Sequence, residues 1–174
     1  NIISGYAFAS QDFNIKHEIP CVKITNVGVG AYLFDDTDDR LPASYLNEYD
    51  RFIVNEGDIL ISLTRSFINS GLKVCIYPDN RKALLNQRVA LIRYCNNKYL
   101  FYYLRTTKVL NYVKEKSKTT NQPNLSIKDL AKMIIPIPSL LEQQEITKIL
   151  DSLFEKEQKA KELCDVIDKI DLMK

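Results

Sequence analysis

The chain has 174 residues, of which 45% are hydrophobic and 26% charged, a composition typical of a globular protein with a substantial core. It contains no signal peptide and no apolar run long enough to cross a bilayer, so we expect a cytoplasmic protein with no membrane contact. Four scattered cysteines and a single histidine argue against a structural zinc site and a disulfide framework, and we therefore expect no metal site.

The net charge of +2 is unevenly distributed along the chain. Residues 1–50 carry a net charge of −5, residues 51–120 a net charge of +9 and residues 121–174 a net charge of −2. A near-neutral protein with a strongly basic middle third is typical of a local anion-binding surface, and the phosphate backbone of DNA is the obvious anion. The alternative is that these basic residues are scattered over the surface and never gather on one face.

Most of the first hundred residues have strand character. Alternating polarity predicts a strand at 20–26. The acidic run at 35–39 is expected to form an exposed loop, and residues 42–47 one helical turn. Turn residues at Gly57-Asp58 and at 78–80 separate apolar runs, which predict three further strands at 59–63, 72–77 and 89–94.

Helical spacing replaces this pattern after residue 96. Asn97 is expected to cap a helix that runs to about Lys114, and Ser126 with Asp129 caps a second, shorter helix. A polar loop at 116–124 separates the two helices. We therefore predict an α+β fold, with a mixed or antiparallel β-rich domain followed by one long helix.

The long helix begins after residue 138. Pro136 and Pro138 fit neither a helix interior nor a central strand, so the chain enters this helix from an extended segment. Ser139 followed by Glu142 forms a capping box, which satisfies the free amides at the helix start. We place the domain boundary here, with a globular domain at 1–138 and a helical arm at 139–174.

The arm carries a heptad repeat. With Ile146 at position a, only Lys156 interrupts the apolar a and d positions, which predicts a coiled coil with a second helix. The alternative is an ordinary long helix packed on its own domain. The predicted coiled-coil interface consists of Ile146, Ile149, Leu153, Ala160, Leu163, Ile167 and Ile170.

Five short motifs occur together in a particular order. They are Ser4-Gly-Tyr-Ala-Phe8, Glu56-Gly-Asp-Ile-Leu-Ile-Ser62, Leu85-Asn-Gln87, Gln122-Pro-Asn-Leu-Ser126 and Ile135-Pro-Ile-Pro-Ser-Leu-Leu-Glu-Gln143. With the heptad helix that follows, this series resembles the specificity (S) subunit of type I restriction-modification systems over essentially the whole chain. The match covers one target recognition domain and its conserved helix, whereas family members usually carry two such repeats. The chain is expected to be a piece of a longer S subunit or a half-size subunit that dimerises.

This resemblance implies a division of labour. The chain would read one half of a bipartite site on double-stranded DNA and direct a methyltransferase (M) subunit and a restriction (R) subunit to it. Its helix would pair with a second recognition repeat, or with a second copy, as a spacer. No cofactor is expected in this chain; S-adenosylmethionine, ATP and Mg would belong to the partner subunits.

Residues that contact DNA are expected in and after the basic middle section. Arginine contacts guanine in a bidentate manner, asparagine and glutamine pair with adenine, and lysine positions the backbone. Gln87 is less suited to reading sequence, because it belongs to the family pattern. The base-edge candidates are Arg65, Arg88, Asn121 and Gln122, and the phosphate candidates are Lys73, Lys116 and Lys118.

Neither catalysis nor a protein-binding role is favoured. Residues 121–124 lack the second proline and the aromatic of an adenine-methyltransferase motif, and a nuclease motif has to be forced from Asp79 and Glu157-Gln-Lys159. No residue is therefore predicted to be catalytic. The alternative function is a coiled-coil assembly module whose globular head binds protein rather than DNA, and such a head has no need of the basic section.

Overall fold

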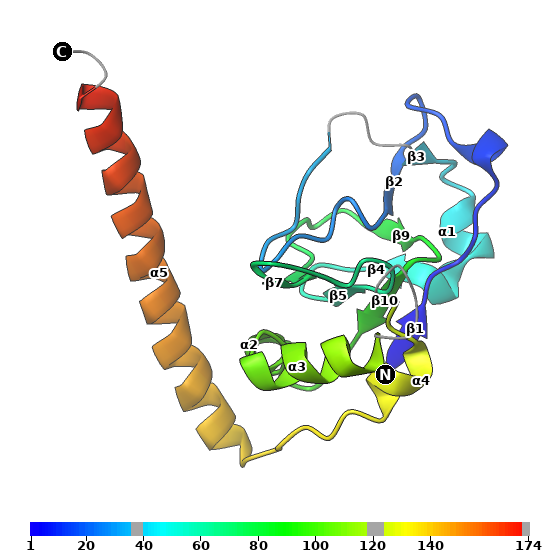
Figure 1. Cartoon of the computed structure of the whole chain (residues 1–174). Helices are drawn as coiled ribbons and strands as arrows, with labels where there is room; N and C mark the ends of the chain where they lie inside the picture. Colours follow the sequence, from blue (N-terminus) through cyan, green and yellow to red (C-terminus); the bar gives the residue numbers. More distant parts are fainter. Residues whose placement is uncertain (36–39, 118–123, 172–174) are drawn as a thin grey trace. The chain divides into compact units, whose positions relative to one another are not determined.

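The computed structural model describes residues 1–35, 40–117 and 124–171. The chain divides into two compact units, Asn1–Ile135 and Pro136–Lys174, and each is described by itself. In the first unit, strands occupy the chain up to residue 92 and most of the helical residues follow (Figure 1). With the long helix of the second unit, this arrangement confirms the predicted α+β fold class.

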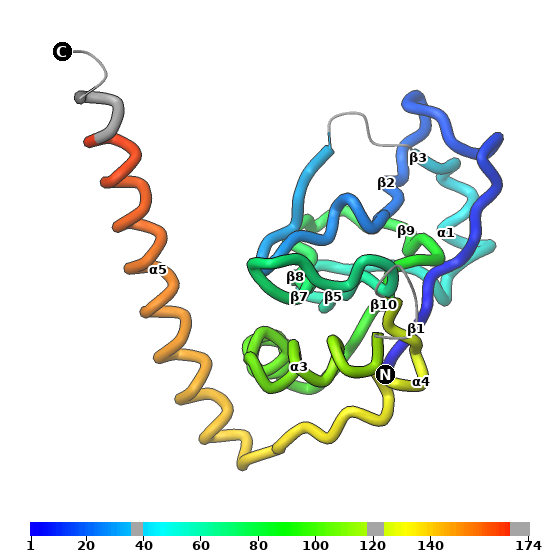
Figure 2. The backbone as a smooth tube through the Cα atoms, in the orientation of Figure 1, coloured from blue at the N-terminus to red at the C-terminus, as the bar shows by residue number. Residues whose placement is uncertain are grey.

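A four-stranded antiparallel sheet forms the centre of the first unit. Its strand order is β1-β10-β5-β8, and the strands are Ile2–Ser4, Val89–Ile92, Ile59–Ser62 and Val74–Ile76. Figure 2 shows the N-terminal segment reaching β10, which lies more than 80 residues later in the chain. The predicted strands at 59–63 and 89–94 are confirmed as the two inner strands of this sheet.

A second sheet has the order β3-β2-β9-β4. Its strands are Arg40–Leu41, Ile19–Val22, Ala83–Leu85 and Ile53–Val54. β2 and β9 pair in parallel, while the other neighbours are antiparallel, so the unit is a mixed β structure as predicted. A small hairpin of β6 (Phe67–Ile68) and β7 (Gly71–Leu72) adds a third pair.

The core consists of layers on both faces of the first sheet. Along β5, Ile59 and Ile61 face the helices, whereas Leu60 faces the second sheet, and all three are fully buried. Because side chains alternate between faces, a strand covered on both sides becomes a continuous apolar run. This explains the uninterrupted Ile-Leu-Ile sequence of β5.

Helices cover the face of the first sheet opposite the second sheet. They are α2 (Asn97–Leu104), α3 (Thr107–Lys116) and α4 (Ile127–Ala131), and they lie below the sheet in Figure 1. α1 (Tyr45–Glu48) packs with the second sheet instead, and it confirms the helical turn predicted at 42–47. Two short 3-10 helices complete the unit, η1 (Ser10–Asp12) and η2 (Asp50–Phe52).

The single helix predicted from Asn97 to Lys114 is wrong. The helix breaks after Leu104, and the hydroxyl of Thr106 accepts a hydrogen bond from the Val109 amide to begin a second helix. The cap of α2 is Asn96, whose side chain accepts from Tyr99. Asn97 instead donates to the carbonyl of Gly57, which connects α2 to the turn before β5.

Two predicted strands also have different bounds. The strand predicted at 20–26 ends at Val22, because the Asn26 side chain accepts from the Lys23 amide and turns the chain. The strand predicted at 72–77 is divided between β7 and β8, with Lys73 at the break. Five short strands, β1, β3, β4, β6 and β9, were not predicted.

The second unit is built around one long helix. α5 runs from Leu140 to Asp171, and its 32 residues give a length of about 48 Å. The predicted capping box is present, since the Ser139 hydroxyl accepts from the Glu142 amide and the Glu142 carboxylate accepts from Ser139. These hydrogen bonds from Ser139 hold the pKa of Glu142 below its usual value.

Candidate nucleic-acid interface

An arginine lies at the tip of the loop that follows β5. Arg65 is exposed and has a φ of 50°, which makes it the one non-glycine residue of the described ranges with positive φ. A non-glycine residue in this region costs roughly 1–2 kcal/mol. The Ser62 hydroxyl supports the turn by donating to the Thr64 carbonyl at 2.7 Å. The fold therefore maintains a strained backbone that presents a guanidinium to solvent.

Lys73 lies beside this loop. Its amide donates to the Ser66 carbonyl at 2.8 Å, and its carbonyl accepts from the Ser62 amide at 3.0 Å, so its backbone is bonded on both sides of Arg65. The Lys73 Nζ donates to the Ile24 carbonyl at 2.7 Å. Partial burial, with a smaller contribution from the charge of Arg65, lowers the pKa of the Lys73 ammonium.

Arg88 lies just before β10, at the same end of the first sheet as the Arg65 loop. We call this end of the sheet, with Arg65, Lys73 and Arg88, the basic edge. Its carbonyl accepts from the Leu63 amide at 2.9 Å, immediately before the Arg65 loop, and its side chain is exposed. The structure therefore brings together three residues predicted separately from sequence, namely Arg65, Lys73 and Arg88.

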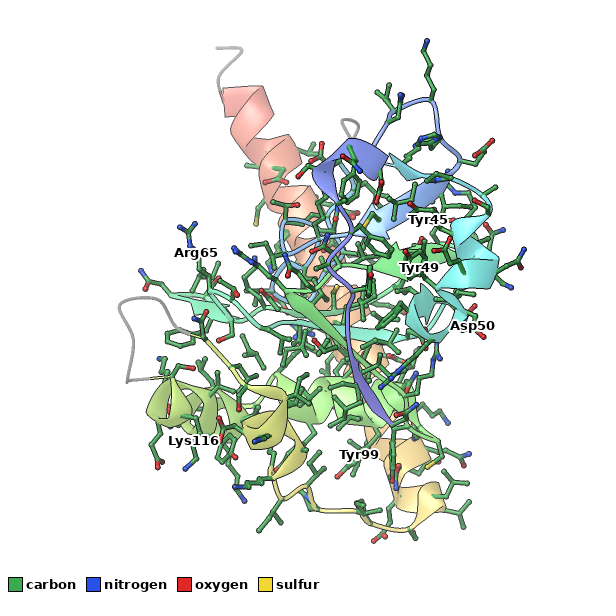
Figure 3. The ribbon with its side chains drawn as sticks, turned by 90° about the vertical axis from the view of Figure 1, so that its right-hand side faces the viewer. Tyr45, Tyr49, Asp50, Arg65, Tyr99 and Lys116 are labelled. Atoms are coloured by element: carbon green, nitrogen blue, oxygen red, sulfur yellow. The ribbon has the colours of Figure 1, made fainter. Side chains whose placement is uncertain are left out.

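Two lysines of α3 extend the basic surface. The Lys114 Nζ lies 5.8 Å from the ring centre of Phe67, which follows the Arg65 loop, and the Lys116 Nζ lies 5.6 Å from that of Tyr112. Figure 3 shows Arg65 and Lys116 on one side of the view, with Tyr45 and Tyr49 on the other. Lys114 was not predicted as a contact, because only its neighbour Phe67 connects it to the loop.

The C-terminal end of the predicted polar loop also reaches this edge. Asn124 forms a bridge with Thr64, and the Leu125 amide donates to the Leu63 carbonyl at 2.8 Å. The Ser117 hydroxyl donates to the Asn124 carbonyl at 3.3 Å. The candidates Lys118, Asn121 and Gln122 lie outside the described residues.

A pocket of about 430 Å³ adjoins the basic edge. Ile24, whose carbonyl holds the Lys73 ammonium, belongs to its lining, and so does Arg88. The Lys23 Nζ lies 4.5 Å from the ring centre of Phe13 on another wall. The pocket thus combines aromatic faces with amide and cationic donors. The lining residues are Phe8, Ser10, Phe13, Lys23, Ile24, Asn86, Gln87 and Arg88.

The residues considered for nuclease chemistry have other interactions. The Asp79 carboxylate accepts from the Arg81 guanidinium at 2.6 Å, and these hydrogen bonds lower the pKa of Asp79. Glu157 forms an ion pair with Lys161 one helical turn later at 2.7 Å. Within the described ranges, no three His, Cys, Asp or Glu side chains are grouped to hold a metal ion.

The apolar seam of α5 is exposed to solvent. Ile149 is 58% exposed, Leu153 54% and Leu163 62%, and Ile146 and Ile167 are also exposed. Ala160 lies on the same exposed helix, whereas the side chain of Ile170 is outside those described. Large apolar side chains repeated at heptad spacing are typical of a helix that pairs with another helix. No helix in the described parts of the chain is both long and apolar enough to cross a membrane.

The described structure thus combines a mixed β domain that carries a basic edge with a long helix that carries an exposed apolar seam. The chain belongs to the family of the type I restriction modification DNA specificity domain, whose model matches residues 1–165. The resemblance seen in the five sequence motifs is therefore confirmed.

Similar proteins of known name support this membership. The chain is 35% identical over 173 residues to the type I restriction enzyme MjaVIII specificity subunit of Methanocaldococcus jannaschii, covering 93% of the chain and 40% of that protein. It is 30% identical over 160 residues to the EcoAI specificity subunit of Escherichia coli, covering 89% of the chain and 27% of that protein. The chain thus spans less than half the length of these relatives. Both relatives are named as specificity subunits, in agreement with the prediction that the chain is not an enzyme.

Solved structures show the same fold. A chain from a structure of the type I restriction-modification system, described for its complex assembly and conformational transition, matches with a TM-score of 0.63 at 21% identity. That match covers 90% of this chain and 36% of the other. The HsdS subunit from Thermoanaerobacter tengcongensis matches with a TM-score of 0.56 at 20% identity, covering 90% and 35% of the two chains.

Proposed function

We propose that this chain reads one half of a bipartite site on double-stranded DNA and directs a partner adenine methyltransferase and a restriction subunit to that site. The observation that carries this proposal is the gathering of Arg65, Lys73 and Arg88 at one edge, beside the ends of a polar loop. Family membership supports the DNA specificity, and the edge supplies the cations that a duplex backbone requires.

We assign residues 1–138 to target recognition and residues 139–174 to the spacer. The exposed seam supports pairing of α5 with a second recognition repeat or with a second copy of the chain. Such a pair of helices would fix the distance between two recognition domains, because helix length increases in steps of about 1.5 Å per residue. We place the complex in the cytoplasm, where its DNA substrate lies.

The chemistry would reside on the partner subunits. The methyltransferase would bind S-adenosylmethionine and flip its target adenine from the duplex, and the restriction subunit would use ATP and Mg. The present chain would bring no cofactor and would supply sequence recognition and spacing.

The test is selection of bound DNA. The purified chain, mixed with its methyltransferase partner, is incubated with random-sequence duplex DNA over a series of salt concentrations, and the bound fraction is sequenced. We expect enrichment of a short motif, with affinity that falls steeply as salt rises. A flat salt response without enrichment would favour the alternative, an assembly module whose head binds protein.

A further inference from the structure

We propose that Arg65 and Lys73 together bind a single backbone phosphate of the DNA, and that neither reads a base. This inference rests on the proposed function and specifies the contact made by the loop after β5. It replaces the base-edge role predicted for Arg65 from sequence, and the two roles give opposite results when sequence discrimination is measured.

The first argument is that strand pairing fixes the two cations as neighbours. β5 and β8 pair with Ile61 opposite Val74, so Lys73 leaves the sheet opposite Ser62. The Lys73 amide then bonds to Ser66, which places it next to Arg65. A loop free to choose its conformation would separate two positive charges, and this loop brings them together in spite of the strained φ of Arg65.

The second argument is that no carboxylate of the described residues pairs with either cation, Arg65 or Lys73. The proximity of Arg65 contributes to the lowered pKa of Lys73, as expected when two like charges approach each other. An anion bound between them would relieve this repulsion.

The third argument concerns the kind of anion. The Lys73 ammonium is tied to the Ile24 carbonyl at 2.7 Å, on a half-buried side chain, so it cannot extend into a groove to reach base edges. The edge of a guanine carries only partial negative charges, whereas a phosphate carries a full charge and several acceptor oxygens. The Lys73 ammonium, held by Ile24, and the exposed Arg65 guanidinium beside it therefore match a phosphate better than a base.

Ser66, in the same loop, allows a matched control variant. The Ser66 hydroxyl is buried and has no hydrogen-bond partner, while its carbonyl accepts from Lys73. Ser66→Ala removes this hydroxyl and keeps both cations and the backbone bond. We expect this variant to bind DNA like the wild type, so a loss of affinity in the cation variants would not reflect a general effect of changing the loop.

The experiment compares Arg65→Ala, Lys73→Met and the double variant on the selected site and on sites with one changed base. Each single variant is expected to bind about tenfold more weakly or worse on every sequence, as for a lost charged hydrogen bond, with the preferred motif unchanged. In a plot of the logarithm of the binding constant against the logarithm of the salt concentration, the slope of the double variant is expected to be smaller in magnitude by about 0.9. This is the value for one phosphate contact, whereas two separate contacts would give twice that amount. Arg65→Gly, which relieves the positive φ, repeats the test if Arg65→Ala melts at a lower temperature.

Neutral methylphosphonate placed at one backbone position at a time identifies the phosphate. We expect one position at which neutralisation weakens binding of each single variant less than that of the wild type, and at which it has no effect on the double variant. Relaxed preference at one base in Arg65→Ala, or two different sensitive phosphates for the two residues, would overturn the shared site and leave the proposed function intact. Failure of the wild type to select any motif would overturn both.

Discussion

The spacer role of α5 predicts what happens when the helix is shortened by one heptad. Removing residues 153–159 joins Ser152 to Ala160 and keeps the a and d positions in register. The deletion also removes Lys156, which is the polar residue of the seam. It is made in α5 and in the helix that pairs with it, so that the two helices still match in length.

The expected change follows from helix geometry. Seven residues at about 1.5 Å each shorten the helix by roughly 10.5 Å of its 48 Å, which corresponds to about three base pairs of DNA at 3.4 Å each. Three base pairs also rotate one half-site by about 100° around the DNA axis, because one turn takes 10 to 10.5 base pairs. We therefore expect a spacer shorter by about two or three base pairs, recognised with lower efficiency.

The assay is to express the variant with its methyltransferase partner and to map N6-methyladenine by long-read sequencing. Removal of residues 153–156 alone is the matched control, since four residues break the register of the seam and should abolish pairing. A heptad deletion that still methylates sites with the original spacing would refute the idea that α5 sets the distance.

Three further predictions test the fold and its electrostatics. Asp58→Ala should lower the free energy of unfolding in urea by about 2–3 kcal/mol, because it leaves the half-buried Arg93 without its bidentate partner, and an unchanged midpoint would contradict this. The folded pKa of Glu142 is lowered, so its contribution to helix stability is present above the unfolded pKa and is lost as pH falls through the folded one. The protection of amides in the first turn of α5, measured relative to their intrinsic exchange rates at each pH, should therefore fall on acidification, and Glu142→Gln should remove this dependence. Burial raises the pKa of the Cys75 thiol to about 12, so mass spectrometry should find alkylation of the exposed Cys95 and not of Cys75 in the native protein.

The inner strands and the long helix could be predicted because their local signals were strong. β10 is apolar over its whole length and β5 over its first three residues, and the capping box at Ser139 and Glu142 marked the start of α5 within one residue. The five strands that were missed have two or three residues each, and all except β6 are held by partners far away in the chain. No periodicity can be detected in two residues, so these strands depend on tertiary pairing.

The break between α2 and α3 was missed for a different reason. Apolar spacing continues across Arg105 and Thr106, and the hydroxyl of a mid-sequence threonine does not by itself distinguish a cap from an exposed helical residue.

The candidate site was predicted in part. Sequence identified Arg65, Lys73 and Arg88 from the charge of the middle section, whereas their meeting at one edge depends on the pairing of three strands.

The pairing of β1 with β10 determines when the first unit can complete its fold during synthesis. Ile2 lies opposite Ile92, and the parallel pair of β2 and β9 joins residues 21–22 to residues 84–85. The first sheet cannot close until Ile92 has left the ribosome, nor the second until Leu85 has, and contacts of such long sequence separation form slowly. Until then the apolar side chains of β1 and β2 remain uncovered in the nascent chain. We therefore expect aggregation to be most pronounced before β9 and β10 have been synthesised.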